Sequence, residues 1–161
     1  GGFSGRLLTD ADSACQVLNR QVAPLESWIE RVAATSPRFV LLGDFNRRVD
    51  EESSQKIPAN KVRVDGTDPA SANKAGPDGQ VTSKYLWQEI SDGNPSLHQV
   101  QPDESAVGCK GFVGLDHILL SSTLRSLQPT EPRSMKLPVA QKSGQKIGTS
   151  DHCPRVTVLK L

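Results

Sequence analysis

Two short motifs carry the residue types from which a phosphoester-cleaving site can be built. Gly43-Asp44-Phe45-Asn46 follows an apolar run, and Ser150-Asp151-His152-Cys153-Pro154 precedes the C-terminal apolar run. A carboxylate can hold a metal ion or activate water, and an imidazolium can stabilise the charge that develops on a phosphate. Together the motifs indicate a metal-assisted phosphoester hydrolase.

The first motif needs a strand to present it. The apolar run over 38–43 predicts a buried strand that delivers Asp44 and Asn46 to its C-terminal tip. Side chains two positions apart on a strand point the same way, so both are expected to face one site. The alternative is that Asp44 caps a turn, because Asp and Asn favour turns through local hydrogen bonds.

Other segments predict the elements around that strand. Apolar residues recur at three- and four-residue steps over 10–34, which predicts a helix that Pro24 should kink or restart. A short helix is expected at 83–90, and strands at 97–100, 115–120 and 155–161. The stretches 51–80 and 128–149 are rich in Pro, Gly, Ser, Lys and Asp, which predicts loops. This order of elements predicts a layered α/β arrangement.

Composition limits the class of protein. The 161 residues suffice for one domain, and a formal net charge of +1 gives no bulk polycation character, although a local basic stripe remains compatible with nucleic acid. No stretch is long and apolar enough to predict a membrane-spanning helix. The three cysteines lack CxxC spacing, which argues against a zinc site, and they do not fix the cellular compartment.

Three motifs in order, GDFN, LDHILLS and SDHCP, resemble those of the endonuclease/exonuclease/phosphatase superfamily, the DNase I-like phosphoesterases. The resemblance covers roughly residues 7–161. It implies an α/β fold, an α+β layered sandwich, of which this chain matches the C-terminal half with a helix-flanked mixed β-sheet. On this resemblance we expect residues 1–161 to be a partial domain without the N-terminal half, since the family's early Asn and Glu metal ligand and its central Tyr or His have no counterpart here.

The resemblance also implies roles for individual residues. Asp44 matches the carboxylate that positions or deprotonates the attacking water, and Asn46 matches its partner, which holds the phosphate or the water. Asp151 resembles the metal-site carboxylate. His152 resembles the histidine that hydrogen-bonds a non-bridging phosphate oxygen, and Asp116 the carboxylate that orients this histidine. The implied metal is Mg²⁺ (or Mn²⁺), because oxygen ligands dominate and no set of thiolates exists.

Two further residues are candidates for binding substrate. Arg47 follows the GDFN motif and could reach a phosphate, with a solvated charged turn as the equal alternative. Phe112 lies where family members often place a residue of the substrate wall, with a core phenylalanine as the alternative.

The resemblance favours a metal-dependent phosphodiesterase, and DNA or RNA is the first choice of substrate. One alternative is a phosphatase or phospholipase acting on a phosphorylated lipid or sugar headgroup. Another is a non-catalytic binding module, because the N-terminal metal ligand is absent. A lone half of a two-sheet sandwich would expose an apolar sheet face, so we expect self-association or pairing with the missing half.

Overall fold

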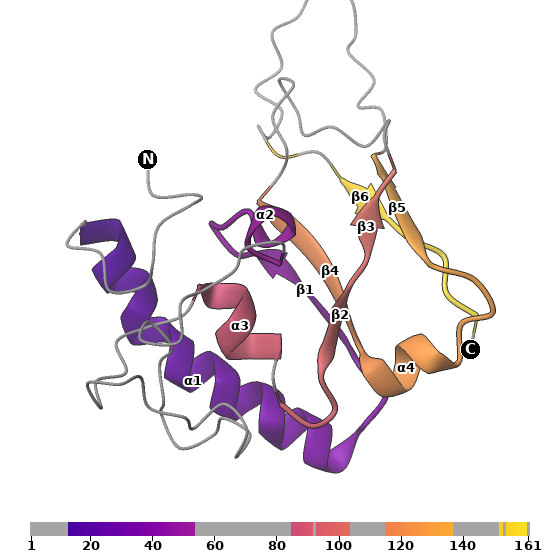
Figure 1. Ribbon diagram of the computed structural model, residues 1–161, viewed down its shortest axis with the longest axis horizontal. Coiled ribbons are helices and arrows are strands. Elements are labelled where there is room, and N and C mark those ends of the chain that lie inside the picture. Colours follow the sequence, from indigo (N-terminus) through magenta and orange to yellow (C-terminus); the bar gives the residue numbers. More distant parts are fainter. Residues whose placement is uncertain are drawn as a thin grey trace, which may run out of the picture.

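The computed structural model describes residues 13–53, 85–91, 93–103, 115–136, 152 and 154–160 (Figure 1). These residues form a mixed helix and strand architecture with small open sheets, consistent with the expected α/β class. The helices are α1 Ser13–Thr35, α2 Val49–Glu52, α3 Leu86–Ser91 and α4 Ser122–Ser126. The strands are β1 Val40–Asp44, β2 Leu97–Gln99, β3 Gln101–Pro102, β4 Asp116–Ser121, β5 Arg133–Lys136 and β6 Arg155–Val156.

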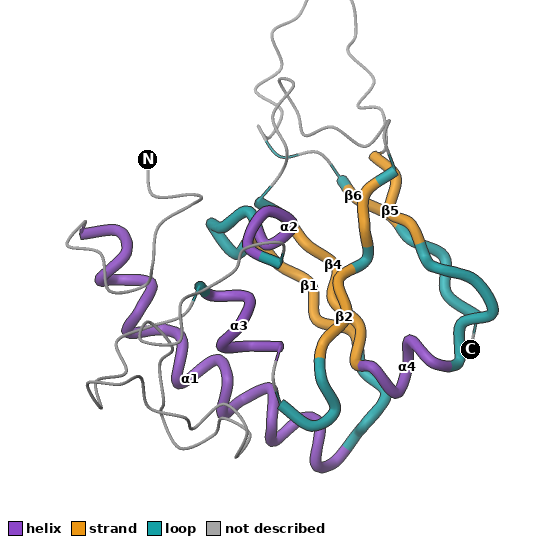
Figure 2. The backbone as a smooth tube through the Cα atoms, in the orientation of Figure 1, coloured by secondary structure: helices purple, strands orange, loops and turns teal. Residues whose placement is uncertain are grey.

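Two three-stranded sheets organise the described residues (Figure 2). The first is antiparallel in the order β1-β4-β2, with Leu41 opposite Leu119 and Asp44 opposite Asp116. The second has the order β3-β5-β6, in which β3 and β5 run parallel and β5 and β6 antiparallel. The second sheet is therefore mixed, whereas the sheet against which α1 and α3 pack is antiparallel, unlike the single helix-flanked mixed sheet that the resemblance implies.

The central strand β4 is covered on both faces. Leu119 joins a cluster on the side of α1 and α3, which also contains Val22, Ile29, Leu41, Phe45, Val49, Leu86, Ile90 and Leu97. Ile118 and Leu120 join a second cluster with Val100 and Leu124. This alternation follows the two-residue period of a strand. It places His117 on the face of Leu119 and Asp116 on the face of Ile118.

Helix α1 runs through Pro24 as one element of 23 residues, so of the two expected effects, a kink or a restart, the restart does not occur. Pro24 is exposed, whereas Val22 and Ile29 on either side of it are buried in one cluster. Packing of these residues outweighs the hydrogen bond that proline cannot make. Among the described residues no helix is long and apolar enough to cross a membrane.

The expectation that the strand before GDFN is buried is wrong for most of β1. Leu41 is buried, but Val40 is 40% and Leu42 65% exposed. Within the described part of the chain β1 pairs with β4 alone, which leaves its other edge without a strand. The exposed apolar side chains therefore lie on an edge strand.

Two other expectations need correction. The strand expected over 155–161 is limited to β6, and the segment after it is held by Gln128, whose side chain bonds the backbone N and O of Lys160 at 2.9 and 3.0 Å. The strand β5 lies inside a stretch expected to be loop. Its pairing with β3 and β6 satisfies the backbone, and local composition does not reveal such pairing.

Candidate functional site

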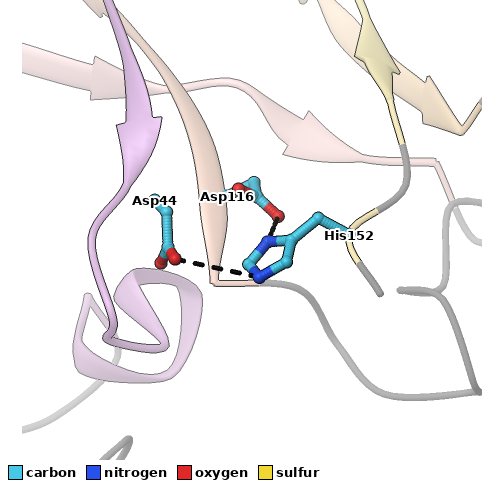
Figure 3. A group of neighbouring side chains, drawn as sticks. All are labelled: Asp44, Asp116 and His152. Atoms are coloured by element: carbon cyan, nitrogen blue, oxygen red, sulfur yellow. Dashed lines mark hydrogen bonds and ion pairs between the residues drawn. The ribbon is translucent and has the colours of Figure 1, made fainter. Parts of the chain in front are cut away.

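Asp44, Asp116 and His152 meet at one end of the first sheet (Figure 3). The β1–β4 register sets Asp44 directly opposite Asp116. His152, shortly before β6, donates from Nδ1–H to Asp116 Oδ2 at 2.8 Å, and its Nε2 lies 3.9 Å from Asp44 Oδ2. One ligand atom from each residue lies within 4.8 Å of the others. The Asp116–His152 hydrogen bond implied by the resemblance is therefore present.

Asn46 reaches this region from a turn rather than from a strand. Strand β1 ends at Asp44, and Asn46 has a φ of 51°, in the left-handed region that Asn tolerates better than most residues. The Asn46 backbone N–H donates to Asp44 Oδ1 at 2.8 Å. The expectation that one strand carries both Asp44 and Asn46 is therefore wrong, and Asp44 does cap a turn.

Arg47 does not reach the surface, so its predicted role in binding substrate is corrected. Its side chain is fully buried and forms an ion pair with Glu52 through Nε and Nη2. The next residue, Arg48, is partly exposed and pairs with Glu51. Both arginines that follow GDFN are thus held by glutamates of α2.

Glu52 links this turn to α3. Its Oε2 accepts a hydrogen bond from the backbone N–H of Trp87 at 3.0 Å, and its carbonyl oxygen accepts one from Gln88 Nε2 at 3.0 Å. Burial raises the pKa of the Glu52 carboxyl above its ordinary value, and the Arg47 guanidinium opposes that shift.

His117 lies next to Asp116 but faces the opposite side of β4, consistent with a structural role. Its Nε2–H donates to the carbonyl oxygen of Arg47 at 2.8 Å, and its Nδ1 accepts from Gln99 Nε2 at 3.2 Å. The ring also packs against Phe45, with centroids 5.9 Å apart. Burial lowers the pKa of His117, and its hydrogen bond to Arg47 is the largest opposing cause. These contacts describe a neutral imidazole.

A pocket of about 800 Å³ lies between the N-terminal half of α1 and β1. Asp44 and Asn46 belong to its lining, which is otherwise mainly apolar and includes Val17, Leu18, Leu25 and Leu42. The pocket thus borders the same turn that carries two of the predicted site residues.

Two predicted site residues, Asp151 and Phe112, lie outside the described residues. Conversely, no sequence motif points to Glu52 or Gln99, although both contact residues of the site region. Only the folded chain brings them to Arg47 and His117.

The donor set suits a hard divalent cation. Two carboxylates and an imidazole lie close together, and all three side chains are partly exposed, so that water can complete an oxygen-rich shell. Comparisons with protein-family models, with curated proteins and with solved structures found no match for this chain.

Proposed function

We propose that this chain carries part of a divalent-metal-dependent phosphodiester hydrolase site of the DNase I-like type, with nucleic acid as the first substrate. The observation that supports the proposal is the meeting of Asp44, Asp116 and His152, which come from three separate parts of the sequence. The order of the GDFN, LDHILLS and SDHCP motifs supports it independently.

Each residue has a distinct task in this proposal. Asp44 accepts a proton from the attacking water through a carboxylate oxygen. Asp116 holds Nδ1–H of His152 and thereby fixes the tautomer and orientation of the ring. The protonated ring then donates from Nε2 to a phosphate oxygen as negative charge develops there.

Mg²⁺ or Mn²⁺ would be held beside these residues. Asp151 is the ligand that the resemblance implies, and Asp116 would add the carboxylate oxygen that does not accept from His152. Such an ion supplies charge neutralisation at the phosphate and at the leaving oxygen.

The test is cleavage of a labelled DNA duplex, with and without an abasic site, in Mg²⁺ and in EDTA. His152→Ala should lower turnover by about 10²-fold or more, because general acid–base groups typically contribute that much. His98→Ala is the matched control, since His98 is also partly exposed but pairs with Glu131, away from the site. EDTA-resistant cleavage, or equal turnover in both variants, would contradict the proposal.

Asp44→Asn separates chemistry from structure at the same position. The asparagine carbonyl oxygen can still accept from the Asn46 N–H, so the turn should persist while the proton acceptor is lost. We expect an unchanged unfolding midpoint and strongly reduced turnover. Wild-type turnover in this variant would remove Asp44 from the mechanism.

Additional substrates distinguish the alternatives. Cleavage of DNA or RNA should weaken steeply with salt, because polyanion binding releases counterions. Turnover of phospholipid or sugar-phosphate headgroups at a rate unchanged by salt would favour the phosphatase or phospholipase. No turnover and no Mg²⁺ binding in a titration would favour a non-catalytic module.

A further inference from the structure

The geometry points to a buried positioning network of Arg47, Glu52 and His117 that fixes the Asp44–Asn46 turn relative to His152. The inference rests on the proposed function in assigning that turn to a reaction, but the network itself is structural. It adds positioning residues to a site whose candidate reacting groups are Asp44, Asn46, Asp116 and His152.

The turn has a conformation that needs support. Asn46 adopts a positive φ of 51°, directly beyond the end of β1. Its backbone N–H bonds the side chain of Asp44, which is itself an exposed residue. A water-exposed local contact competes with solvent, so it restrains the turn less than a buried contact does.

The first buried contact acts on the turn's backbone. His117 donates from Nε2–H to the carbonyl oxygen of Arg47, one residue after Asn46. Gln99 Nε2 donates to Nδ1 of His117. This leaves the ring proton on Nε2, which can then donate to Arg47. The ring also packs against Phe45, within the same turn. His117 therefore holds the turn by polar and apolar contacts at once.

The same strand holds the opposite side of the site. Asp116, the neighbour of His117, points to the other face of β4 and bonds His152 Nδ1. Two adjacent residues of β4 thus anchor the two halves of the site, one the turn of Asp44 and Asn46 and the other the imidazole. Any movement of the turn relative to β4 would change its distance from His152.

The second buried contact acts through a side chain. Arg47 forms an ion pair with Glu52, and the two side chains are 0% and 1% exposed. Glu52 also accepts from the Trp87 N–H, which connects the turn to α3. Helix α3 supplies Leu86 and Ile90 to the main hydrophobic cluster. The turn is thereby tied to the core by a second route, through Glu52 and α3.

A buried ion pair is a poor way to gain stability alone, because desolvation of both charges offsets much of their attraction. Unlike apolar residues of similar size, Arg47 and Glu52 interact only in a defined orientation. The guanidinium contacts the carboxylate through two nitrogens at fixed angles. A directional anchor at residue 47 restricts the rotation of the backbone at Asn46. We therefore assign the pair to positioning.

The experiment compares two substitutions at His117. His117→Phe keeps a ring beside Phe45 but removes the donor to Arg47. His117→Gln places an amide N–H near the position of Nε2–H and should restore the donation. Leu124→Ala is the control, because Leu124 is buried in the second cluster, whereas Phe45 of the turn and Leu86 of α3 belong to the first.

Two readouts are taken on the full chain. NMR should show displaced signals for the Asn46 backbone amide and the His152 ring in His117→Phe, and near-native signals in His117→Gln and Leu124→Ala. In the cleavage assay kcat should fall by about 10–100-fold in His117→Phe with KM within about twofold, since a small misplacement of reacting groups costs that much. His117→Gln should recover most of the loss.

The two readouts separate the two ideas. If wild-type protein cleaves no substrate, the proposed function fails, while the NMR comparison still decides the network. Native signals for Asn46 and His152 in His117→Phe would overturn the positioning role. If His117→Phe does not fold, the double variant Arg47→Met, Glu52→Leu replaces it, because an apolar pair often substitutes for a buried ion pair without loss of stability. Displaced signals there support the proposal, and native signals overturn it.

Discussion

Asp44 makes two contacts at once, one through each carboxylate oxygen. Oδ1 accepts from the Asn46 N–H at 2.8 Å, and Oδ2 faces His152 Nε2 at 3.9 Å. A turn-capping Asp and a reactive Asp are often treated as competing interpretations of one motif. Here the short side chain has an oxygen for each, so the contact that shapes the turn also aims the second oxygen at the histidine.

Asn46 permits a test of side chain against backbone. Asn46→Gly readily adopts the positive φ but lacks the amide, so its stability should stay close to wild type while turnover falls. Asn46→Ala loses the amide and also pays about 1–2 kcal/mol for the left-handed conformation. Urea unfolding and the cleavage assay on both variants measure the two effects. Wild-type turnover in Asn46→Gly would show that only the turn's shape matters.

At the scale of elements, β4 does most of the organising. Its residues alternate between two hydrophobic clusters, and its first two positions supply Asp116 and His117 to opposite faces. A strand buried on both faces has little freedom to shift its register, because a one-residue slip would exchange every side chain between the faces.

Substitutions in the buried strand β4 and in the exposed strand β1 should differ in their effect on stability. Leu119→Ala should lower the free energy of unfolding by about 2–5 kcal/mol, because Leu119 is 0% exposed in the main cluster. Leu42→Ala, at a side chain 65% exposed, should change it by no more than about 0.5 kcal/mol. Denaturant unfolding of both variants gives the comparison. Similar losses in the two would mean that Leu42 is covered in solution.

A surface cluster joins β2 to the segment after α4. Glu131 pairs with His98 and Arg125, and these partners lower the pKa of its carboxyl, Arg125 being the larger cause. A lowered folded pKa means that the contribution to stability is present above the unfolded value of 4.5 and is lost as pH falls below it. The contribution is small, because exposed ion pairs contribute at most about 1 kcal/mol.

The measurement is the unfolding midpoint of wild type and Glu131→Gln between pH 3 and 7. The two curves should converge at the acidic end and separate above it, and added salt should reduce the separation. A constant difference across this range would mean that the carboxylate's charge contributes nothing.

How far the sequence predicts this structure depends on whether the signal is local. The helix over 10–34 and the strands near 97–100 and 115–120 rest on periodic or continuous apolar residues, and α1, β2 and β4 confirm them within a few residues. The burial of Arg47 was not predictable in this way. Its partner Glu52 lies in a polar stretch, and Glu52 in turn accepts a hydrogen bond from Trp87 of α3, more than thirty residues further along the chain.

The site was predicted by a different route. Spacing alone could place neither Asp116 nor His152 beside Asp44. Asp116 on β4 follows Asp44 on β1 by 72 positions in the sequence. The resemblance supplied that grouping, and the structure has its contacts. A turn capped by Asp44 was the alternative to a continuing strand, but neither route supplied the positive φ of Asn46, because that conformation depends on the support of residues around it.

At the scale of the molecule, the candidate site lies at the end of an edge strand. Strand β1 carries Asp44 at its tip and has β4 as its one partner among the described residues. The face of β1 that bears Asp44 also bears Val40 and Leu42, both exposed. An exposed apolar edge strand is a template for pairing with another chain.

We therefore predict that the chain self-associates through β1, and Leu42→Lys tests this prediction. A lysine on an edge strand opposes pairing, because its charge would be desolvated in the contact. Sedimentation should show a mass that rises with protein concentration for wild type and stays monomeric for Leu42→Lys. Leu127→Lys is the control, since Leu127 is also exposed, at 51%, but lies beyond α4. A wild-type monomer at every concentration would mean that the exposed face of β1 does not recruit a second copy, and equal association in all three proteins would place the contact elsewhere.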